Sequence, residues 1–263
     1  MSVKRIEAKS FMNKSELDGD LTCNPYYGCS HHCIYCYAKY IMQGPVTSKN
    51  WDEDILVKEF SNYDIPKGTG PARLLLSTAT DPYQPLEMKE KVTRKILEAI
   101  VDSDLHVSIL TKSKHVIRDI DLFKRMKDVS VSFSIALDDE MSAIIEPGAS
   151  RPSERIEALK ILHGENIRTG VLMAPILPYL SDVFSIIDKI RGYADSVMLD
   201  TLNLKNPEHI RHVMAFIATR FPEYYEGYRK IFIKKDKTYY QKLKEEILAC
   251  ESETPFGLKH IYK

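Results

Sequence analysis

The sequence has no excess of charge of either sign and no long hydrophobic run, and both absences exclude classes of protein. Its 263 residues include 37 Lys and Arg against 37 Asp and Glu, so no overall field draws the chain to nucleic acid or to a membrane. No apolar stretch approaches the roughly 20 residues of a membrane span, and the first residues lack the hydrophobic segment of a signal peptide. We therefore expect a cytoplasmic protein that has no membrane partner.

Cysteine is scarce, and the chain has no linker, repeat or low-complexity tract that would divide it. A hydrophobic fraction of 44% over this length predicts one sizeable core. Four of the five cysteines lie between positions 23 and 36. In a reducing compartment, such a group is more typical of metal ligands than of disulfides.

Three of these cysteines, Cys29, Cys33 and Cys36, form a CxxxCxxC motif. Three thiolates at this spacing can hold three corners of a cubane iron–sulfur cluster and leave the fourth iron open to a substrate. Zinc is the alternative, because a fourth ligand is available nearby from Cys23, His31 or His32. Zinc sites usually consist of two separated CxxC-type pairs, however, and no second pair follows here. We therefore expect these three cysteines to be the only protein ligands of one cluster, with Cys23 and Cys250 outside it.

Short apolar runs alternate with segments of helical periodicity, which predicts an α/β fold of parallel strand–helix units. Six strands are expected, at residues 21–23, 73–78, 106–111, 129–135, 169–174 and 196–200. One intervening helix would place Met88, Val92, Ile96 and Ile100 on a single face. A later helix would bury Ile156, Leu159 and Leu162 and end with Gly164 as its C′ glycine.

The segment after Asp200 has mostly helical patterning. Asn206, Pro207 and Glu208 are typical of a helix start, with an N-cap, a proline at the first position and an acid in the first turn. Between Tyr224 and Lys244, basic residues are interleaved with aromatic ones, a pattern that can bind nucleic acid. The alternative, which we favour, is a closing helix whose stripe of Tyr224, Tyr228 and Phe232 packs against the core.

The cysteine motif and its flanks resemble the radical SAM superfamily, whose members bind S-adenosylmethionine (SAM) at the open iron. The flanking motifs are similar to those of the branch that contains spore photoproduct lyase and many uncharacterised relatives. They are Asn24–Gly28 before the cysteines, Thr80–Pro85 after the second strand, Glu146–Gly148, and Arg155–Ala158. The resemblance extends from about Lys9 to Asp200, which is most of the chain.

This resemblance implies an open (βα)6 partial TIM barrel with a helical C-terminal extension. The implied boundaries are an N-terminal segment at residues 1–20, a radical SAM core at residues 21–205 and an extension at residues 206–263 that packs on the core. The implied cofactors are a [4Fe-4S] cluster and SAM, and the implied electron donor is a reductant such as ferredoxin or flavodoxin. The implied reaction is reductive cleavage of SAM to a 5′-deoxyadenosyl radical, which abstracts hydrogen from an unidentified substrate. The alternatives are a nucleic-acid repair or modification enzyme of the same branch and a non-catalytic iron–sulfur or zinc module.

The polar residues at the expected strand ends suit a zwitterionic amino acid that carries a ribose. By resemblance, Thr80 and Asp81 would hold the SAM amino group and Lys112 its carboxylate. Ser134 would contact the ribose or the carboxylate, and Arg155 would lie near the carboxylate. The predicted set is completed by Thr78 and Ala174. For the hydroxyl and acidic residues the alternative is a cap or turn, and for Arg155 it is solvent exposure or pairing with Glu154 or Glu157.

Two tyrosines in the motif, Tyr35 and Tyr37, resemble a radical relay of the lyase branch, and simple packing is the alternative. In that branch, a hydrogen-donating cysteine directly precedes the pair that Thr80 and Asp81 match. Ala79 stands there in this chain, so the resemblance disfavours reversal of spore photoproduct. The segment Glu146–Gly148 is interpreted as a turn that sets a loop over the site.

Overall fold

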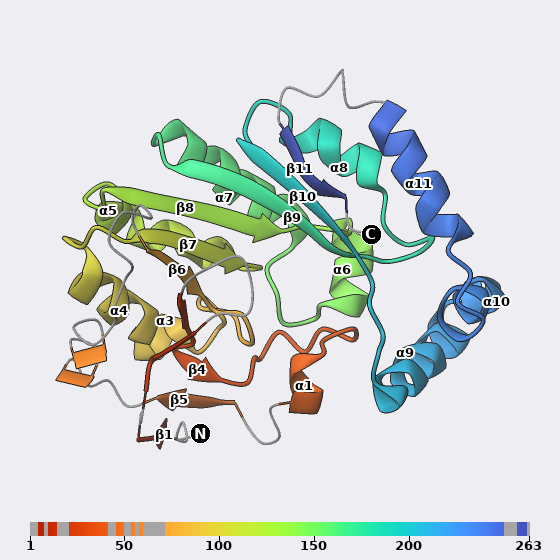
Figure 1. The fold of residues 1–263 in the computed structure, drawn as a ribbon, viewed down its shortest axis with the longest axis horizontal. Helices are drawn as coiled ribbons and strands as arrows, with labels where there is room; N and C mark the ends of the chain where they lie inside the picture. Colours follow the sequence, from red (N-terminus) through yellow and green to blue (C-terminus); the bar gives the residue numbers. More distant parts are fainter. Residues whose placement is uncertain are drawn as a thin grey trace.

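The computed structural model describes residues 5–7, 10–14, 21–41, 46–49, 54–55, 58–59, 72–249 and 257–261. Its centre is a curved sheet whose strands run in the order β11-β10-β9-β8-β7-β6-β3-β2 (Figure 1). Seven neighbouring strands of this sheet are parallel and follow chain order, and the first six of them are the predicted ones: β3 (Leu21–Cys23), β6 (Arg73–Leu76), β7 (His106–Thr111), β8 (Asp128–Ser134), β9 (Arg168–Ile176) and β10 (Ser196–Thr201). The predicted six-stranded parallel sheet of an open partial barrel is confirmed.

Further strands extend or adjoin this sheet. β2 (Met12–Lys14) pairs antiparallel with β3, and β11 (Gly257–Ile261) pairs parallel with β10. β11 is an exception to the mostly helical structure expected after Asp200. It pairs with β10, Ser196 lying opposite Gly257, and local patterning does not reveal a partner 61 residues away. A separate small sheet contains β1 (Arg5–Ile6), β5 (Thr47–Lys49) and β4 (Tyr26–Tyr27).

One hydrophobic core fixes the sheet and its helices. Alternate residues of the strands are buried, as Val107 and Ile109 in β7 and Val131 and Phe133 in β8 illustrate. The helices that follow the strands are α3 (Glu87–Glu90), α4 (Val92–Ile100), the short 3₁₀ helix η1 (Lys114–Asp119), α5 (Ile120–Phe123), α6 (Asp139–Ile145), α7 (Pro152–Gly164) and α8 (Val183–Ile190). Because β6, β7, β8, β9 and β10 run parallel and each is followed by helical structure, their carboxyl ends meet at one edge of the barrel.

Two details of the predicted helices are wrong. The first helix is broken at Lys91, which has φ 53°, so Met88 is 42% exposed while Val92 and Ile96 are buried. The break arises because the buried carboxylate of Glu87 accepts hydrogen bonds from the backbone of Thr93 and Arg94 and thereby caps α4.

The predicted C-terminal end of α7 is also wrong. Gly164 is the last helical residue, and it is Asn166, with φ 59°, that adopts the left-handed conformation beyond the helix. The predicted buried face is confirmed, since Ile156, Leu159 and Leu162 are all buried.

The C-terminal helices pack on the barrel through a second hydrophobic cluster. α9 (Pro207–Arg220) begins as predicted, with the Asn206 side chain accepting from the backbone of Glu208 and His209. It is followed by η2 (Pro222–Tyr224), α10 (Tyr225–Tyr228), the π-helical η3 (Arg229–Ile233) and α11 (Thr238–Ala249). Tyr228 and Phe232 are buried in this cluster with Leu137 and Leu177, and Tyr224 packs against it, which confirms the predicted packing.

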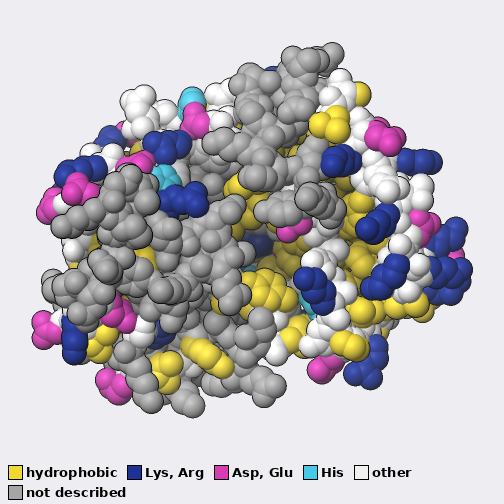
Figure 2. All heavy atoms as spheres, viewed as in Figure 1, with side chains coloured by type: hydrophobic (Ala, Val, Ile, Leu, Met, Phe, Trp, Pro, Cys, Tyr) yellow, Lys and Arg dark blue, Asp and Glu magenta, His cyan; other side chains and the backbone are white. Residues whose placement is uncertain are grey.

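The lysines of this region face outward. Figure 2 shows Lys and Arg side chains gathered on the side of the molecule where Figure 1 places α9, α10 and α11. Lys234, Lys235 and Lys237 are exposed. The domain boundaries at residues 20 and 205 stay a prediction. Among the described helices, none is both long and apolar enough to cross a bilayer.

Candidate active site

The three motif cysteines lie on residues 28–37, here called the cysteine loop, which joins β4 to α1 (Ala38–Ile41). Cys29 and Cys36 are partly exposed and Cys33 is buried, and all are free thiols. Gly28 begins the loop with φ 77°, a conformation that L side chains rarely adopt. The backbone N–H of Cys36 donates to the carbonyl of Cys33 at 3.1 Å and closes a turn between these two residues.

The thiols of this loop suit a positively charged partner. Burial raises the pKa of Cys33 to about 12, and burial together with the charge of Asp81 raises the pKa of Cys29 above its usual range. A metal supplies the opposing charge that a buried thiolate needs. Among the residues that the structure describes, no three His, Cys, Asp or Glu side chains are grouped around the position of a single ion. A cubane cluster does not need such a group, because each cysteine binds a different iron. The donor set therefore fits a cluster.

Gln84, from the segment between β6 and α3, holds one side of the cysteine loop. Its side-chain oxygen accepts from the backbone N–H of Ser30 at 2.9 Å and from the Ser30 hydroxyl at 3.1 Å. Its side-chain nitrogen donates to the carbonyl of Gly28 at 3.2 Å and to Thr80 Oγ1 at 3.0 Å. Thr80, a predicted SAM ligand, itself donates to the Gly28 carbonyl. The predicted Thr80 site is thus adjacent to the cysteines.

The end of α6 and the segment after it also hold the loop. The backbone N–H of Ile34 donates to the carbonyl of Ile145 at 2.9 Å, and the N–H of Gly148 donates to the carbonyl of His31 at 3.0 Å. The buried carboxylate of Glu146 accepts a hydrogen bond from the Tyr35 hydroxyl. The predicted turn at Glu146–Gly148 therefore lies against the loop, and Glu146 does more there than form a turn.

Arg155 supplies the charge that keeps Glu146 ionised. Its Nη2 lies 2.6 Å from Glu146 Oε2, and both side chains are buried. Burial alone would raise the pKa of Glu146, but the charges of Arg155 and Lys112 outweigh it and lower the pKa to about 2. Arg155 also donates to the carbonyls of Ser134 and Ser150 at 2.7 Å.

These contacts contradict the alternative considered for Arg155, and its place near the SAM carboxylate stays a prediction. It pairs neither with Glu154 nor with Glu157, and it does not face solvent. Its guanidinium is used within the chain, which favours a positioning role over direct contact with SAM.

Asp81 and Lys112 lie together at the ends of β6 and β7. The Asp81 carboxylate accepts from the Tyr83 N–H at 2.9 Å, from Thr111 Oγ1 at 2.8 Å and from the Lys112 N–H at 2.7 Å, and it lies 3.5 Å from His31 Nδ1. The carboxylate is buried and heavily engaged, so these contacts orient Lys112 and His31. The role of Asp81 as a SAM ligand stays a prediction.

Among the described residues of this site, Lys112 carries an ammonium group that has no ion-pair partner. No ion pair of its ammonium group occurs within the described part of the chain, where its nearest aromatic neighbour is Tyr35, with Nζ 5.7 Å from the ring centroid. Because Tyr35 belongs to the cysteine loop, the ammonium lies beside that loop. An unpaired ammonium there can bind a carboxylate.

The remaining predicted residues surround the same edge of the barrel. Ser134 Oγ donates to the carbonyl of Ala174 at 3.1 Å, which joins the ends of β8 and β9. Tyr37 is 50% exposed, and its hydroxyl donates to the Thr78 carbonyl at 2.8 Å. Tyr35 and Tyr37 therefore point to different partners. Cys23 is buried in β3, and Cys250 lies outside the described residues.

Three residues that contact the cysteine loop or Asp81 were not predicted to do so from the sequence: Gln84, His31, which was considered only as a zinc ligand, and Glu146, which was interpreted only as part of a turn. Gln84 and Glu146 lie within motifs that carried the family resemblance, and that membership was the signal that could have identified them. Their hydrogen-bond partners are 54 and 111 residues away in sequence, so no local pattern reveals the contacts.

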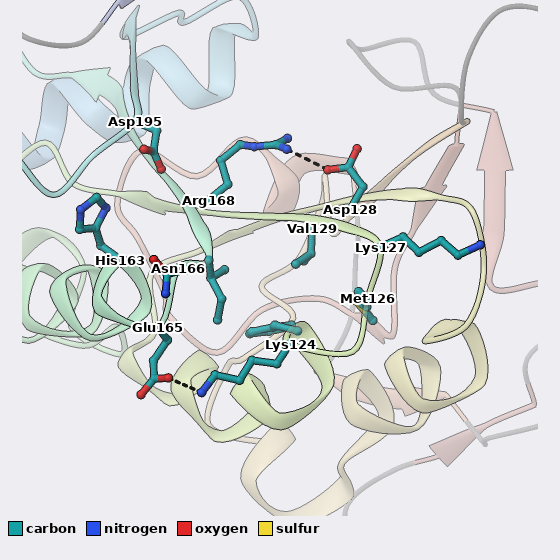
Figure 3. A pocket seen from close by; sticks show the side chains of 12 residues that line it. Lys124, Met126, Lys127, Asp128, Val129, His163, Glu165, Asn166, Arg168 and Asp195 are labelled. Atoms are coloured by element: carbon teal, nitrogen blue, oxygen red, sulfur yellow. Dashed lines mark ion pairs between the residues drawn. The ribbon is translucent and has the colours of Figure 1, made fainter.

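A cavity of about 660 Å³ lies at the other end of the barrel (Figure 3). Asp128 and Arg168 begin β8 and β9 there, and they form an ion pair at 3.1 Å. Lys124 and Glu165 form a second ion pair across the cavity wall. The amino ends of barrel strands contribute to stability rather than to catalysis, and the charges are already paired, so we do not assign the active site here.

The fold and the cysteine loop define a class: an open parallel α/β barrel that carries a three-cysteine loop at the carboxyl edge of its sheet. Residues 23–190 match the family model of the radical SAM superfamily. The chain therefore belongs to the radical SAM superfamily, whose enzymes typically use a [4Fe-4S] cluster and SAM. An uncharacterised protein of Methanocaldococcus jannaschii is 30% identical over 99% of this chain and 97% of its own length. An uncharacterised protein of Mycobacterium bovis is 28% identical over 86% of this chain and 72% of its own length.

Solved structures share the fold. A spore photoproduct lyase mutant with dinucleoside spore photoproduct aligns with a TM-score of 0.66 and 18% identity, over 84% of this chain. This chain spans 66% of that lyase, slightly under two thirds. Streptococcus suis SuiB bound to S-adenosylmethionine aligns with a TM-score of 0.52 and 12% identity, over 76% of this chain and 48% of that chain. At these identities the likeness concerns the fold, and it confirms the predicted similarity to the lyase branch.

Proposed function

We propose that this protein is a radical SAM enzyme in which Cys29, Cys33 and Cys36 hold one [4Fe-4S] cluster. When bound, the cluster supplies the electron that divides SAM into methionine and a 5′-deoxyadenosyl radical, which removes a hydrogen atom from the substrate. The observation that carries the proposal is the free ammonium of Lys112 beside the cysteine loop.

The residues around the loop would bind SAM by complementary polarity. Lys112 would hold the carboxylate, and the hydroxyls of Thr80 and Ser134 would contact the amino group and the ribose. Thr80 supports this assignment because its hydroxyl lies within hydrogen-bond reach of the residue that precedes Cys29. Together these contacts would hold the amino-acid end of SAM at the open iron, and alignment of this kind lowers the barrier to reaction.

Tyr35 and Tyr37 are proposed as a hydrogen relay from the cofactor side of the site. Tyr35 has a carboxylate acceptor in Glu146, and Tyr37 is half exposed at the mouth of the barrel. The substrate would therefore approach on the side of Tyr37. A nucleic acid is the second candidate substrate, favoured by the exposed lysines of the C-terminal region in Figure 2. Affinity for oligonucleotides that falls steeply with salt would identify it.

The proposal is tested by measuring 5′-deoxyadenosine after anaerobic reconstitution with dithionite and SAM. Lys112→Ala removes one charge-assisted contact, so we expect about a tenfold or greater loss in the rate of SAM cleavage per cluster at limiting SAM. The matched control is Lys114→Ala, two residues further along the chain, which removes a half-buried lysine that pairs with Glu154 and leaves the rate near that of the parent. Equal rates in the two variants would contradict the assignment of Lys112.

A further inference from the structure

The contacts that hold the cysteine loop have a common feature: in the described part of the chain, Gln84 and the α6 region bond to residues beside and between the cysteines and to none of the three sulfurs. Gln84 engages Gly28 and Ser30. The end of α6 and the segment after it engage His31, Ile34 and Tyr35. Hydrogen bonds of this kind fix the backbone of the loop and leave its three thiols available to bind a cluster.

Both sets of contacts are made by buried side chains whose hydrogen-bonding capacity is used. Gln84 is fully buried, and its amide makes two hydrogen bonds through the oxygen and two through the nitrogen. Glu146 accepts from Tyr35, from Ser142 Oγ at 3.2 Å and from Arg155 at 2.6 Å. Arg155 is in turn fixed by two backbone carbonyls. Buried networks that are fully satisfied are rigid and specify one arrangement.

We propose that Gln84 and Glu146 are positioning residues that fix the cysteine loop from two sides before the cluster is inserted. The inference rests on the proposed function, and it adds an order of events: the metal-free protein already holds its loop in the binding conformation. Ligand groups held by supporting hydrogen bonds bind more tightly, because less conformational freedom is lost when the metal arrives. Glu146 acts through Tyr35, and Arg155 acts through Glu146.

Each of two variants removes the hydrogen bonds between one of these two side chains and the cysteine loop. Tyr35→Phe deletes the hydroxyl that reaches Glu146 and leaves the Glu146–Arg155 pair in place, so folding is preserved. Gln84→Met keeps the shape of the side chain and removes all four hydrogen bonds. The matched control is Tyr83→Phe, because the Tyr83 hydroxyl also donates to a buried carboxylate that is paired with arginine, Asp119 at 3.0 Å, but its hydroxyl is not a contact of the cysteine loop.

Hydrogen–deuterium exchange of residues 28–37 in the metal-free proteins is the first readout. Loss of one hydrogen bond to the loop is expected to speed local exchange about fivefold or more in Tyr35→Phe, while Tyr83→Phe leaves the exchange of the loop as in the parent. Release of iron to a chelator from the reconstituted proteins is the second readout, and it should accelerate by a similar factor in Tyr35→Phe and Gln84→Met. If Gln84→Met does not fold, Tyr35→Phe alone decides.

Exchange and iron release at the parental rates in Tyr35→Phe would overturn the inference. That failure is distinct from failure of the proposed function, which is shown by a parent protein that takes up no iron. In that case the exchange comparison of the metal-free proteins still decides whether Tyr35 and Glu146 fix the loop.

Discussion

Gly148 offers a sharp test of how closely the α6–α7 segment approaches the cysteine loop. A Cβ atom added at Gly148 would lie 2.2 Å from the carbonyl oxygen of Ser30 and 2.8 Å from the Cα of His31. Both atoms are backbone, so no side-chain rotation relieves the overlap. Gly148→Ala therefore forces the segment and the loop apart by about 1 Å before ordinary contact is restored.

The magnitude follows from two terms. Overpacking at a site that cannot relax freely costs about 1–3 kcal/mol. Separation of the two segments also strains the hydrogen bond between the Gly148 N–H and the His31 carbonyl, which is worth about 1 kcal/mol. We therefore expect the free energy of unfolding of the metal-free protein to fall by about 2–4 kcal/mol, and the iron content after reconstitution to fall with it.

Urea unfolding and iron analysis of the same preparations measure both effects. Gly164→Ala is the matched control, because nothing lies within 4 Å of a Cβ at Gly164 and the residue is the last of α7. Ala in a helix is favoured over Gly, so this variant should be as stable as the parent or more stable by about 0.5 kcal/mol. A Gly148→Ala protein with parental stability and parental iron content would refute the close approach on which the reasoning depends.

Three further outcomes are expected. The pKa of Glu146 is lowered in the folded state, so its ionisation stabilises the fold by about 3 kcal/mol above pH 4.5. This contribution is lost as the pH falls from 4.5 toward 2. The double variant Glu146→Gln, Arg155→Met should therefore show a shallower acid unfolding transition by circular dichroism. An equally steep acid transition in that variant would contradict this. Tyr228→Phe should leave the free energy of unfolding unchanged or raise it by up to about 1 kcal/mol, because the buried Tyr228 hydroxyl has no hydrogen-bond partner among the described residues; a loss above 1 kcal/mol in urea unfolding would show that a partner exists. Because Ala79 replaces the hydrogen-donating cysteine, the reconstituted enzyme should not convert synthetic dinucleoside spore photoproduct to two thymines, and clean conversion in a chromatographic assay would disprove the expectation.

The strands were predictable because their signal is local. β3 and β7 have the predicted bounds, since alternate apolar residues bounded by polar ones identify a buried strand without reference to the rest of the chain. The helix break at Lys91 was not predictable in the same way. It depends on the Glu87 carboxylate, whose buried position is set by Arg118 and Tyr26, far away in sequence.

The candidate site likewise contains residues that local sequence identifies and residues that it does not. The cysteine motif and Lys112 are identified by residue type and by position at a strand end, which the sequence contains. The role of Arg155 depends on which carboxylate it meets, and its partner Glu146 is fixed only when α6 and α7 fold against each other. The pairing of buried charges between these two helices, although the partners are only nine residues apart, is therefore the part of this site that could not be predicted from the sequence.

The most direct test of the proposed cluster site is the metal content of protein purified and reconstituted without oxygen, compared with that of the variants Cys29→Ala, Cys33→Ala and Cys36→Ala. We expect about four irons and four sulfides per parent chain, an electron paramagnetic resonance signal of a reduced [4Fe-4S] cluster that changes when SAM is added, and loss of that signal in each variant. Cys23→Ala, which changes a buried thiol outside the loop, should retain the cluster. Zinc without iron in the parent, or a full cluster in any of the three loop variants, would show that these cysteines do not hold a [4Fe-4S] cluster as proposed.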